Sequence, residues 1–303
     1  MKKRILFIIN PVAGVKRKDK IPRYINKYLD HNKFTYEVIY TESRGHATKI
    51  AKDNAKNNID VVCVAGGDGS VNEAATGLIG SNTALAIIPS GSGNGLARHL
   101  GYSINIRSTL QIINEYHIKR IDVCKVNDHF FFSLIGIGFD AYAAKVFSKE
   151  ETRGFLTYAW ASIKSIASYQ PFEYKMKINN ETIDGTAFMI NVCNSNQFGY
   201  NVKVAPYADI QDGIMDIVII KKLPKIQIPI LVLQLFMRTH LFSMYVKYIK
   251  TEKLSIESPA HAYLQIDGET VHKAKDFEIT VQKGALSVLV NNDKFVYPVT
   301  LGN

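Results

Sequence analysis

Two glycine-rich segments each follow a short apolar run, and their residues are of types that bind anions. The first, residues 66–70 (GGDGS), follows the apolar run 61–65 and precedes a helical pattern over 71–79. Glycines let the backbone approach a ligand closely, and a helix N-terminus presents free N–H groups to an anion. Because a carboxylate repels bare phosphate, Asp68 indicates a metal ion or water between the two. Taken alone, this segment could also be a plain connecting turn.

The second segment, residues 89–98 (PSGSGNGLAR), again joins an apolar run to a helical pattern. A third loop of small residues, 10–14 (NPVAG), follows the first apolar run of the chain. Successive strands of a parallel sheet end at the same edge, so the three loops are expected to converge there. Their convergence predicts a nucleotide site.

The elements that must position these loops alternate between strands and helices along the first 120 or so residues, a pattern typical of a parallel α/β sheet. The expected strands are 5–9, 36–40, 61–65 and 84–89, and the expected helices are 20–29, 46–57 and 71–79. We predict an α/β domain over residues 1–122, to which residues 291–303 return.

Beyond Asp122 the pattern changes to many short strands, which indicates a second, β-rich domain over residues 123–290. The expected strands are 130–135, 173–178, 186–191, 215–220, 253–257, 262–266 and 277–281, with helical insertions at 154–168 and 225–247. A cleft between two domains is the usual place for a ligand, so we expect the site there.

Charge and composition narrow the class of partner. The chain has 37 Lys and Arg against 27 Asp and Glu, a formal charge of +10. This excess favours nucleotide phosphates or an anionic membrane, and without an arginine-rich tract interleaved with aromatics we expect no nucleic acid. Cys63, Cys124 and Cys193 lie in apolar runs, which favours reduced thiols in a cytoplasmic protein. The apolar stretch 226–237 is shorter than the about 20 residues of a membrane span.

The motifs together make the sequence recognisable. Asn10-Pro11 with Gly14, GGDGSVNE (66–73), PSGSGNGLAR (89–98), DGIMD (212–216) and IDGE (266–269) occur in order along nearly the whole chain. This combination resembles the diacylglycerol kinase catalytic domain family, which includes sphingosine and ceramide kinases. The resemblance implies an α/β nucleotide-binding domain, like that of the NAD kinases and diacylglycerol kinases, followed by a β-rich domain that is a β-sandwich. The chain as a whole would then be a two-domain α+β protein. The resemblance also implies an enzyme that uses ATP and Mg²⁺.

The resemblance assigns residues to the nucleotide. Asp68 is linked to the catalytic magnesium. The residues implied to contact ATP are Asn10, Gly14, Thr41, Gly66, Gly67, Asp68, Gly69, Ser70, Val71, Asn72, Gly91 and Ser92. Where diacylglycerol kinases continue into Asn-Asp, this chain has Asn94-Gly95, which is more like the long-chain-base kinases.

Two Asp-Gly turns in the second domain are implied to carry further chemistry. Glu269 is the expected general base for the acceptor hydroxyl. Asp212 is the expected carboxylate of a structural magnesium site, together with the main-chain carbonyls of Asp209 and Ile214. For both segments an ordinary hairpin turn is the alternative, since Asp-Gly is a strong turn signal.

We therefore predict an ATP-dependent lipid kinase that converts diacylglycerol to phosphatidate. A sphingosine, long-chain-base or other lipid-alcohol kinase is the first alternative, and an NAD kinase or a non-catalytic nucleotide- or lipid-binding regulator are the others. The expected partner is a lipid substrate at an anionic membrane surface, reached by peripheral contact with the inner face of the cell membrane, and a homodimer is compatible with the sequence. The helix expected around 226–237 has basic flanks, so it is either core or a bilayer contact.

Overall fold

The chain folds into two compact units. The computed structural model describes residues 1–12, 20–148, 168–179, 181–197, 202–270 and 273–295, with positions 160, 162 and 164–166. Gly14 and most of the expected helix 154–168 lie outside the described residues. The first unit runs from Met1 to Val123 and takes the chain back from Lys283, earlier than the expected position 291. The second unit begins at Cys124 and continues to Gln282.

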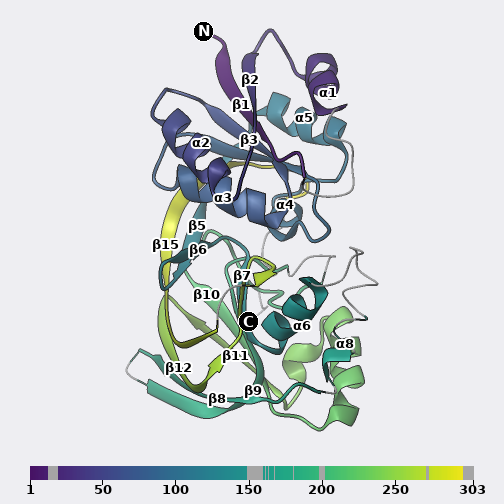
Figure 1. Cartoon of the computed structure of the whole chain (residues 1–303), viewed down its shortest axis with the longest axis vertical. Coiled ribbons are helices and arrows are strands. Elements are labelled where there is room, and N and C mark those ends of the chain that lie inside the picture. Colours follow the sequence, from purple (N-terminus) through teal and green to yellow (C-terminus); the bar gives the residue numbers. More distant parts are fainter. Residues whose placement is uncertain are drawn as a thin grey trace. The chain divides into compact units, whose positions relative to one another are not determined.

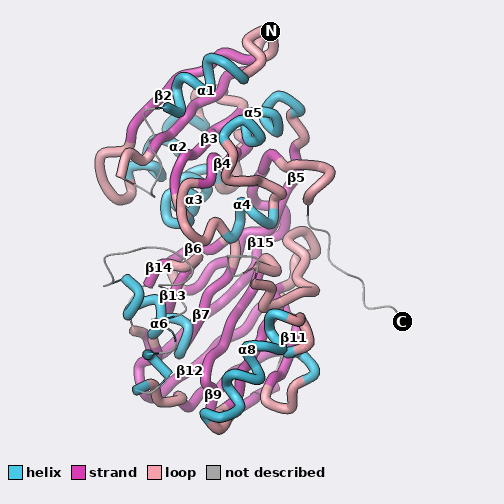
Figure 2. Tube along the Cα trace, turned by 90° about the vertical axis from the view of Figure 1, so that its right-hand side faces the viewer, coloured by secondary structure: helices cyan, strands magenta, loops and turns pink. Residues whose placement is uncertain are grey.

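The first unit is built on a parallel sheet in the order β2-β1-β3-β4 (Figure 1 and Figure 2). The strands are β1 (Lys3–Ile9), β2 (Phe34–Tyr40), β3 (Val61–Gly66) and β4 (Ala84–Pro89). Every residue of β3 and β4 is buried, as expected for strands covered on both faces. The end of a later strand, β15 (Ala274–Leu289), adds parallel to β4 with Val288 opposite Leu85.

Helices cover both faces of this sheet, α1 packing with α5 and α2 packing with α3 (Figure 1). The helices are α1 (Ile21–Tyr28), α2 (His46–Ala55), α3 (Asp68–Leu78), α4 (Gly95–His99) and α5 (Ile106–Glu115). Helix α3 begins at Asp68, not at the expected Val71. Gly67 is its extended N-cap residue, which places the Asp68 carboxylate in the first turn, where the helix dipole favours a negative charge.

The second unit is mostly antiparallel, with strand order β14-β13-β7-β9-β8-β12-β15 (Figure 1 and Figure 2). Strand β10 pairs with β9 and, on its other side, with β11. The strands of this part are β5 (Ile118–Val126, shared with the first unit), β6 (His129–Phe131), β7 (Leu134–Gly138), β8 (Phe172–Ile178), β9 (Glu181–Cys193), β10 (Met215–Lys221), β11 (Val246–Thr251), β12 (Lys253–Ala262), β13 (Leu264–Ile266), β14 (Glu269–Thr270) and the first part of β15. Their buried residues form two apolar clusters, one within the sheet and one that includes residues of α8.

The helical segments described from end to end beside these strands are α6 (Phe139–Ser148), η2 (Lys225–Gln227), α8 (Ile228–Phe236) and η3 (His240–Phe242). Helical residues are also described at positions 160, 162, 164–166 and 168. The helical insertion expected over 225–247 is present but divided into η2, α8 and η3, and its helical part ends at Phe242. Arg238 adopts a left-handed φ of 61°, which ends α8, and from Val246 the chain pairs with β10 as β11. Within the described residues, no helix is long and apolar enough to cross a membrane.

A buried histidine in the second unit is expected to make stability depend on pH. The His240 ring is 1% exposed, its Nε2 lies 2.8 Å from the Val204 carbonyl oxygen, and its Nδ1 has no partner among the described residues. Burial lowers the pKa of His240, against the opposing effect of the Val204 hydrogen bond. The unfolded chain binds a proton near pH 6.5 and the folded chain resists it, so stability is present above that pH and is lost as pH falls.

We therefore expect the free energy of unfolding of the wild type to fall more steeply between pH 7 and pH 5 than that of His240→Gln, whose amide can still donate to Val204. Urea unfolding at a series of pH values measures this. His129→Gln, at an exposed position, is the matched control and should follow the wild type. Parallel profiles for His240→Gln and the wild type would contradict the assignment.

Candidate active site

The loops that follow β1, β2 and β3 are joined at the carboxyl edge of the parallel sheet. The Asn10 backbone N–H donates to the Ala65 carbonyl at 3.0 Å, and the Asn10 side-chain amide donates to the Ser70 hydroxyl at 2.9 Å. The Thr41 N–H donates to the Ile9 carbonyl at 2.9 Å. These hydrogen bonds bring together the predicted nucleotide residues of three strand ends.

Asp68 connects the first glycine-rich loop to the second. Its Oδ2 accepts from the Asn94 N–H at 2.8 Å, and its Oδ1 accepts from the Gly95 N–H at 2.8 Å. The second loop is closed further by the Asn94 side chain, whose Oδ1 accepts from the Gly91 N–H and whose Nδ2 donates to the Gly91 carbonyl. The carboxylate expected near a metal is thus also the contact that fixes the start of α4.

Several glycines here allow backbone segments of the protein to approach one another. A Cβ on Gly91 would lie 2.7 Å from the Gly67 Cα, closer than real side chains come. A Cβ on Gly66 would lie 2.4 Å from the Ser70 Cβ. The sequence pattern indicates that these glycines provide room for a ligand; the structure shows that they also provide room for the second loop and for the first turn of α3.

The other residues predicted to contact the nucleotide differ in how much of each side chain is exposed. Val71 is 6% exposed and packs in the core, so only its backbone can face a ligand. Asn72 is half-buried on α3, and Ser92 is exposed in the second loop. Gly14 lies outside the described residues.

Sequence reasoning missed the role of Glu73. Its carboxylate accepts from the Gly45 N–H at 2.8 Å and the Ala47 N–H at 3.3 Å, at the N-terminus of α2. Gly45 precedes that helix with a left-handed φ of 80° and provides no side-chain cap. Glu73 supplies the missing cap from α3, so the GGDGSVNE segment also fixes the position of a second helix.

In the second unit, the predicted base lies on a tight hairpin. Strands β13 and β14 pair Ile266 with Glu269, and the turn between them places Asp267 and Gly268 at φ values of 47° and 86°. Two successive left-handed residues are typical of a type I′ turn. The hairpin geometry considered from sequence is present, and it carries Glu269 on β14 with an exposed side chain.

Asp267 fixes this hairpin to the neighbouring chain. Its Oδ2 accepts from the Phe132 N–H at 3.0 Å, and its Oδ1 accepts from the N–H groups of Ser133 and Leu134 at 2.8 and 3.1 Å. These contacts explain why the strand expected over 130–135 is instead broken into β6 and β7. The aspartate two residues before the predicted base is therefore a positioning residue, which sequence reasoning did not identify.

Asp267→Ala is expected to lower the free energy of unfolding by about 1–3 kcal/mol, because three partly buried N–H groups lose their acceptor. Asp267→Asn keeps one oxygen and should lose less. Urea unfolding of both variants measures the effect. Asp128→Ala, which removes a carboxylate that is 99% exposed, is the control, and equal midpoints for Asp128→Ala and Asp267→Ala would refute the role.

The predicted metal segment is an acidic turn. The Asp212 Oδ1 accepts from the Ile214 N–H at 2.8 Å, and the Asp209 Oδ1 accepts from the Gln211 N–H at 3.0 Å. The Lys250 ammonium lies 3.8 Å from the Asp212 Oδ2 and 3.5 Å from the Oδ1 of Asp216, the second residue of β10.

Asp216 gives this turn an unusual electrostatic character. Its side chain is buried, Tyr248 donates to its Oδ1, and its Oδ2 has no hydrogen-bond partner among the described residues. Burial raises the pKa of the Asp216 carboxyl to about 7; Lys250 opposes the rise, and Asp212 adds to it. The carboxyl groups of Asp216, Asp212 and Asp209 make this turn acidic, a charge that a bound cation would compensate. The described residues contain no group of three or more side chains placed to hold a metal ion, and the magnesium site at Asp212 stays a prediction.

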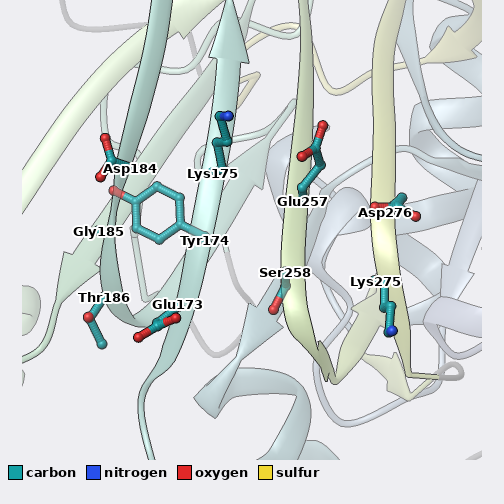
Figure 3. Close-up of a pocket in the computed structure, with 10 residues that line it drawn as sticks. All are labelled: Glu173, Tyr174, Lys175, Asp184, Gly185, Thr186, Glu257, Ser258, Lys275 and Asp276. Carbon is teal, nitrogen blue, oxygen red and sulfur yellow. The ribbon is translucent and has the colours of Figure 1, made fainter.

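A groove of about 670 Å³ lies on the second unit's sheet, and none of these predicted residues lines it. Figure 3 shows its lining side chains on β8, β9, β12 and β15. The lining includes the four carboxylates of Glu173, Asp184, Glu257 and Asp276 but only two lysines, Lys175 and Lys275. The excess negative charge would repel phosphate, so this groove is unsuited to a nucleotide.

Two family models account for most of the chain. The diacylglycerol kinase catalytic domain matches residues 4–126, and the YegS C-terminal NAD kinase beta sandwich-like domain matches residues 133–290. The chain belongs to the diacylglycerol kinase catalytic domain family. It is an enzyme, a kinase of lipid type, and the predicted order of an α/β domain followed by a β-sandwich domain is confirmed.

Relatives of this lipid kinase align over most of its length. It is 27% identical to the diacylglycerol kinase of Staphylococcus saprophyticus, over 89% of this chain and 90% of that one. The diacylglycerol kinase of Bacillus subtilis is 26% identical, over 88% and 90%. A solved structure of a diacylglycerol kinase from Bacillus anthracis superposes with a TM-score of 0.79 at 25% identity, covering 96% of this chain and 98% of that chain. An Archaeoglobus fulgidus NAD kinase shares the fold, with a TM-score of 0.54 at 12% identity.

Proposed function

We propose that this lipid kinase transfers the γ-phosphate of ATP to the hydroxyl of diacylglycerol and forms phosphatidate. The observation that carries the phosphotransfer is the joined pair of glycine-rich loops, connected through Asp68 at the start of α3. The diacylglycerol kinases that align over about nine-tenths of the chain support the acceptor.

The nucleotide phosphates are proposed to bind at the carboxyl edge of the parallel sheet. Helix α3 begins at Asp68 directly after the buried strand β3, so its first backbone N–H groups and the positive end of its dipole are available at that edge. The Asn10 amide, held on the Ser70 hydroxyl, adds a polar group from the neighbouring loop. A backbone-lined site of this kind binds phosphate without requiring a base or a nucleophile of its own.

Glu269 is proposed to receive the proton of the acceptor hydroxyl. As the hydroxyl oxygen forms its bond to the γ-phosphorus, the bond from that phosphorus to the β–γ bridging oxygen breaks. The proton passes to the Glu269 carboxylate, and ADP leaves with the bridging oxygen. Glu269 is exposed at the end of a hairpin that Asp267 holds in place, so the base is accessible while its backbone is fixed.

Magnesium is proposed at two places. Asp68 would be linked to the ion that accompanies the nucleotide, and the Asp212 carboxylate would bind a structural ion with the carbonyls of Asp209 and Ile214. When bound, magnesium neutralises negative charge on the phosphates. At the acidic turn a cation would compensate the carboxylates that Lys250 reaches only at 3.5 and 3.8 Å.

We expect added Mg²⁺ to raise the melting temperature of the wild type by a few degrees without nucleotide, since an ion held by the folded state alone stabilises it by mass action. Asp212→Asn should lose most of this rise. Asp276→Asn, in the acidic groove, should retain it. A thermal melt against Mg²⁺ concentration measures the effect, and an undiminished rise in Asp212→Asn would remove Asp212 from the site.

A long-chain base is the second candidate acceptor. The second loop continues as Asn94-Gly95, as in the long-chain-base kinases, where diacylglycerol kinases carry Asn-Asp. Gly95 offers Asp68 a backbone N–H and no carboxylate of its own. The first glycine-rich loop thus faces one fewer negative charge than the diacylglycerol kinase pattern would provide.

The test is phosphate transfer from γ-labelled ATP with Mg²⁺ to mixed micelles that contain diacylglycerol, sphingosine or ceramide, with NAD in a parallel reaction. Label on diacylglycerol, absent with Glu269→Gln, is the expected result. Label on sphingosine alone would select the second candidate. Label on NAD alone would refute lipid as the acceptor.

A further inference from the structure

An apolar surface on the second unit has no role in the proposed chemistry. Eight of the fifteen large apolar side chains that are exposed in the described residues fall between positions 226 and 244, each 46% to 83% exposed. We call them the α8–η3 surface: Ile226, Ile230, Val232, Leu233, Phe236, Met237, Phe242 and Met244. Single exposed apolar residues are ordinary, but a cluster of this size marks an interaction site.

The α8–η3 surface is presented by an anchored helix. On the opposite side of α8, Ile228 and Leu231 are buried in an apolar cluster that includes Val218 of β10 and Val246 of β11. Figure 2 shows α8 lying beside β11. Because nearly every residue of α8 is apolar, the helix can bury one side in the protein and still present an apolar side outward. The sequence pattern alone favours a core helix; the exposed side is what that pattern does not reveal.

The charged residues in the chain segment that carries the α8–η3 surface are all basic. Between Asp216 and Glu252 the chain has no acidic residue. It has six basic ones there: Lys221, Lys222, Lys225, Arg238, Lys247 and Lys250. Lys250 lies near the two aspartates of the acidic turn, and the other five are exposed. The Lys221 ammonium donates to the Met244 carbonyl at 3.3 Å, which holds a positive charge at the border of the apolar surface.

The positive charge around the α8–η3 surface favours an anionic bilayer over a second copy of the chain as the partner that binds there. A second copy of the chain, related by a two-fold axis, would bring the same basic residues to face each other across the contact, where they repel. An anionic bilayer offers acyl chains to the apolar residues and negative headgroups to the lysines. Helix α8 has nine residues, a length of roughly 14 Å against about 30 Å for the hydrocarbon core, so it can lie on a bilayer and not span one.

We propose that the α8–η3 surface docks the kinase on anionic membranes, with its apolar side chains in the boundary between headgroups and acyl chains and its lysines on lipid phosphates. The proposal rests on the proposed function in one respect, that the acceptor is a lipid of a membrane. It adds the surface by which the enzyme reaches that lipid.

The test is sedimentation of the full chain with vesicles of phosphatidylcholine, with and without phosphatidylglycerol. The double variant Leu233→Gln/Phe236→Gln removes two side chains that are 60% and 55% exposed, at helix positions three residues apart. Ile104→Gln, at a position 51% exposed in the first unit, is the matched control. We expect the double variant to bind phosphatidylglycerol vesicles at least about tenfold more weakly, the control to bind like the wild type, and the wild type to bind pure phosphatidylcholine poorly.

A second pair of measurements separates docking from catalysis. The double variant should phosphorylate a short-chain diacylglycerol dispersed below its micelle concentration at the wild-type rate and lose activity on the acceptor in vesicles. One outcome is that the wild type binds vesicles through Leu233 and Phe236 and yet phosphorylates no acceptor. That result would support membrane docking by the α8–η3 surface and refute the proposed acceptor. Wild-type vesicle binding by the double variant overturns the proposal. The alternative is that the α8–η3 surface is a dimer interface. Sedimentation velocity without lipid would then show a dimer for the wild type and a monomer for the double variant.

Discussion

Replacing Glu269 with glutamine is expected to lower kcat by about 10²- to 10⁴-fold, the usual contribution of a general base. Glutamine has the same shape and preserves the backbone pairing of Glu269 with Ile266, so the hairpin should remain. It cannot accept the proton of the acceptor hydroxyl. Because the nucleotide residues named above lie in the first unit, the dissociation constant for ATP should be unchanged.

The measurement is steady-state turnover on micellar diacylglycerol, with ATP binding followed by calorimetry. Glu252→Gln, an exposed glutamate between β11 and β12, is the matched control and should turn over normally. A fall in kcat that comes with an equal loss of ATP affinity would indicate a structural effect. Normal turnover by Glu269→Gln would exclude it as the base.

Replacing Asp68 with asparagine should weaken both nucleotide binding and the fold of the first unit. The asparagine side chain can present only one oxygen to the N–H groups of Asn94 and Gly95, and its amide would face the other as a second donor. Leaving such a group without an acceptor costs about 1–3 kcal/mol, which corresponds to a loss of roughly 5- to 150-fold if it is expressed in ATP affinity. The two glycine-rich loops are held together by this carboxylate, so both are affected.

Two readouts separate the contributions of Asp68. Urea unfolding without nucleotide or Mg²⁺ reports the connection between the loops alone, and the ATP dissociation constant reports the site. Asp53→Asn, which alters an exposed aspartate on α2, is the control for both. Unchanged stability without ligands would mean that the hydrogen bonds to Asn94 and Gly95 contribute nothing, and would assign any loss of affinity to the ligands.

The first unit could be predicted largely from sequence because β3, β4 and most of β1 are buried apolar runs. The apolar residues 84–89 are both the expected strand and the observed β4, and the predicted glycine-rich loop follows it directly. The predicted start of α3 is three residues too late, because glycines favour a loop in a sequence pattern, whereas here Gly67 is an N-cap and Gly69 lies within the helix.

What could not be predicted depends on contacts between residues far apart in sequence. The break between β6 and β7 arises from Asp267, more than 130 positions away, and no local pattern around Phe132 indicates it. Strand β11 is not among the expected strands, and its first two residues fall within the helical insertion expected over 225–247; it forms by pairing with β10. The capping of α2 by Glu73 likewise requires knowing that α3 packs beside it.

The path of β15 has a consequence for how the protein is made. This strand pairs with β12 in its first part and adds Val288 to the sheet edge beside β4 in its last part, where Leu286, Leu289 and Val290 are also buried. Ribosomes synthesise β4 some two hundred residues before that segment emerges. During synthesis the β4 edge of the first unit therefore stays unpaired until that segment has emerged, and an unpaired apolar sheet edge is open to pairing with other chains.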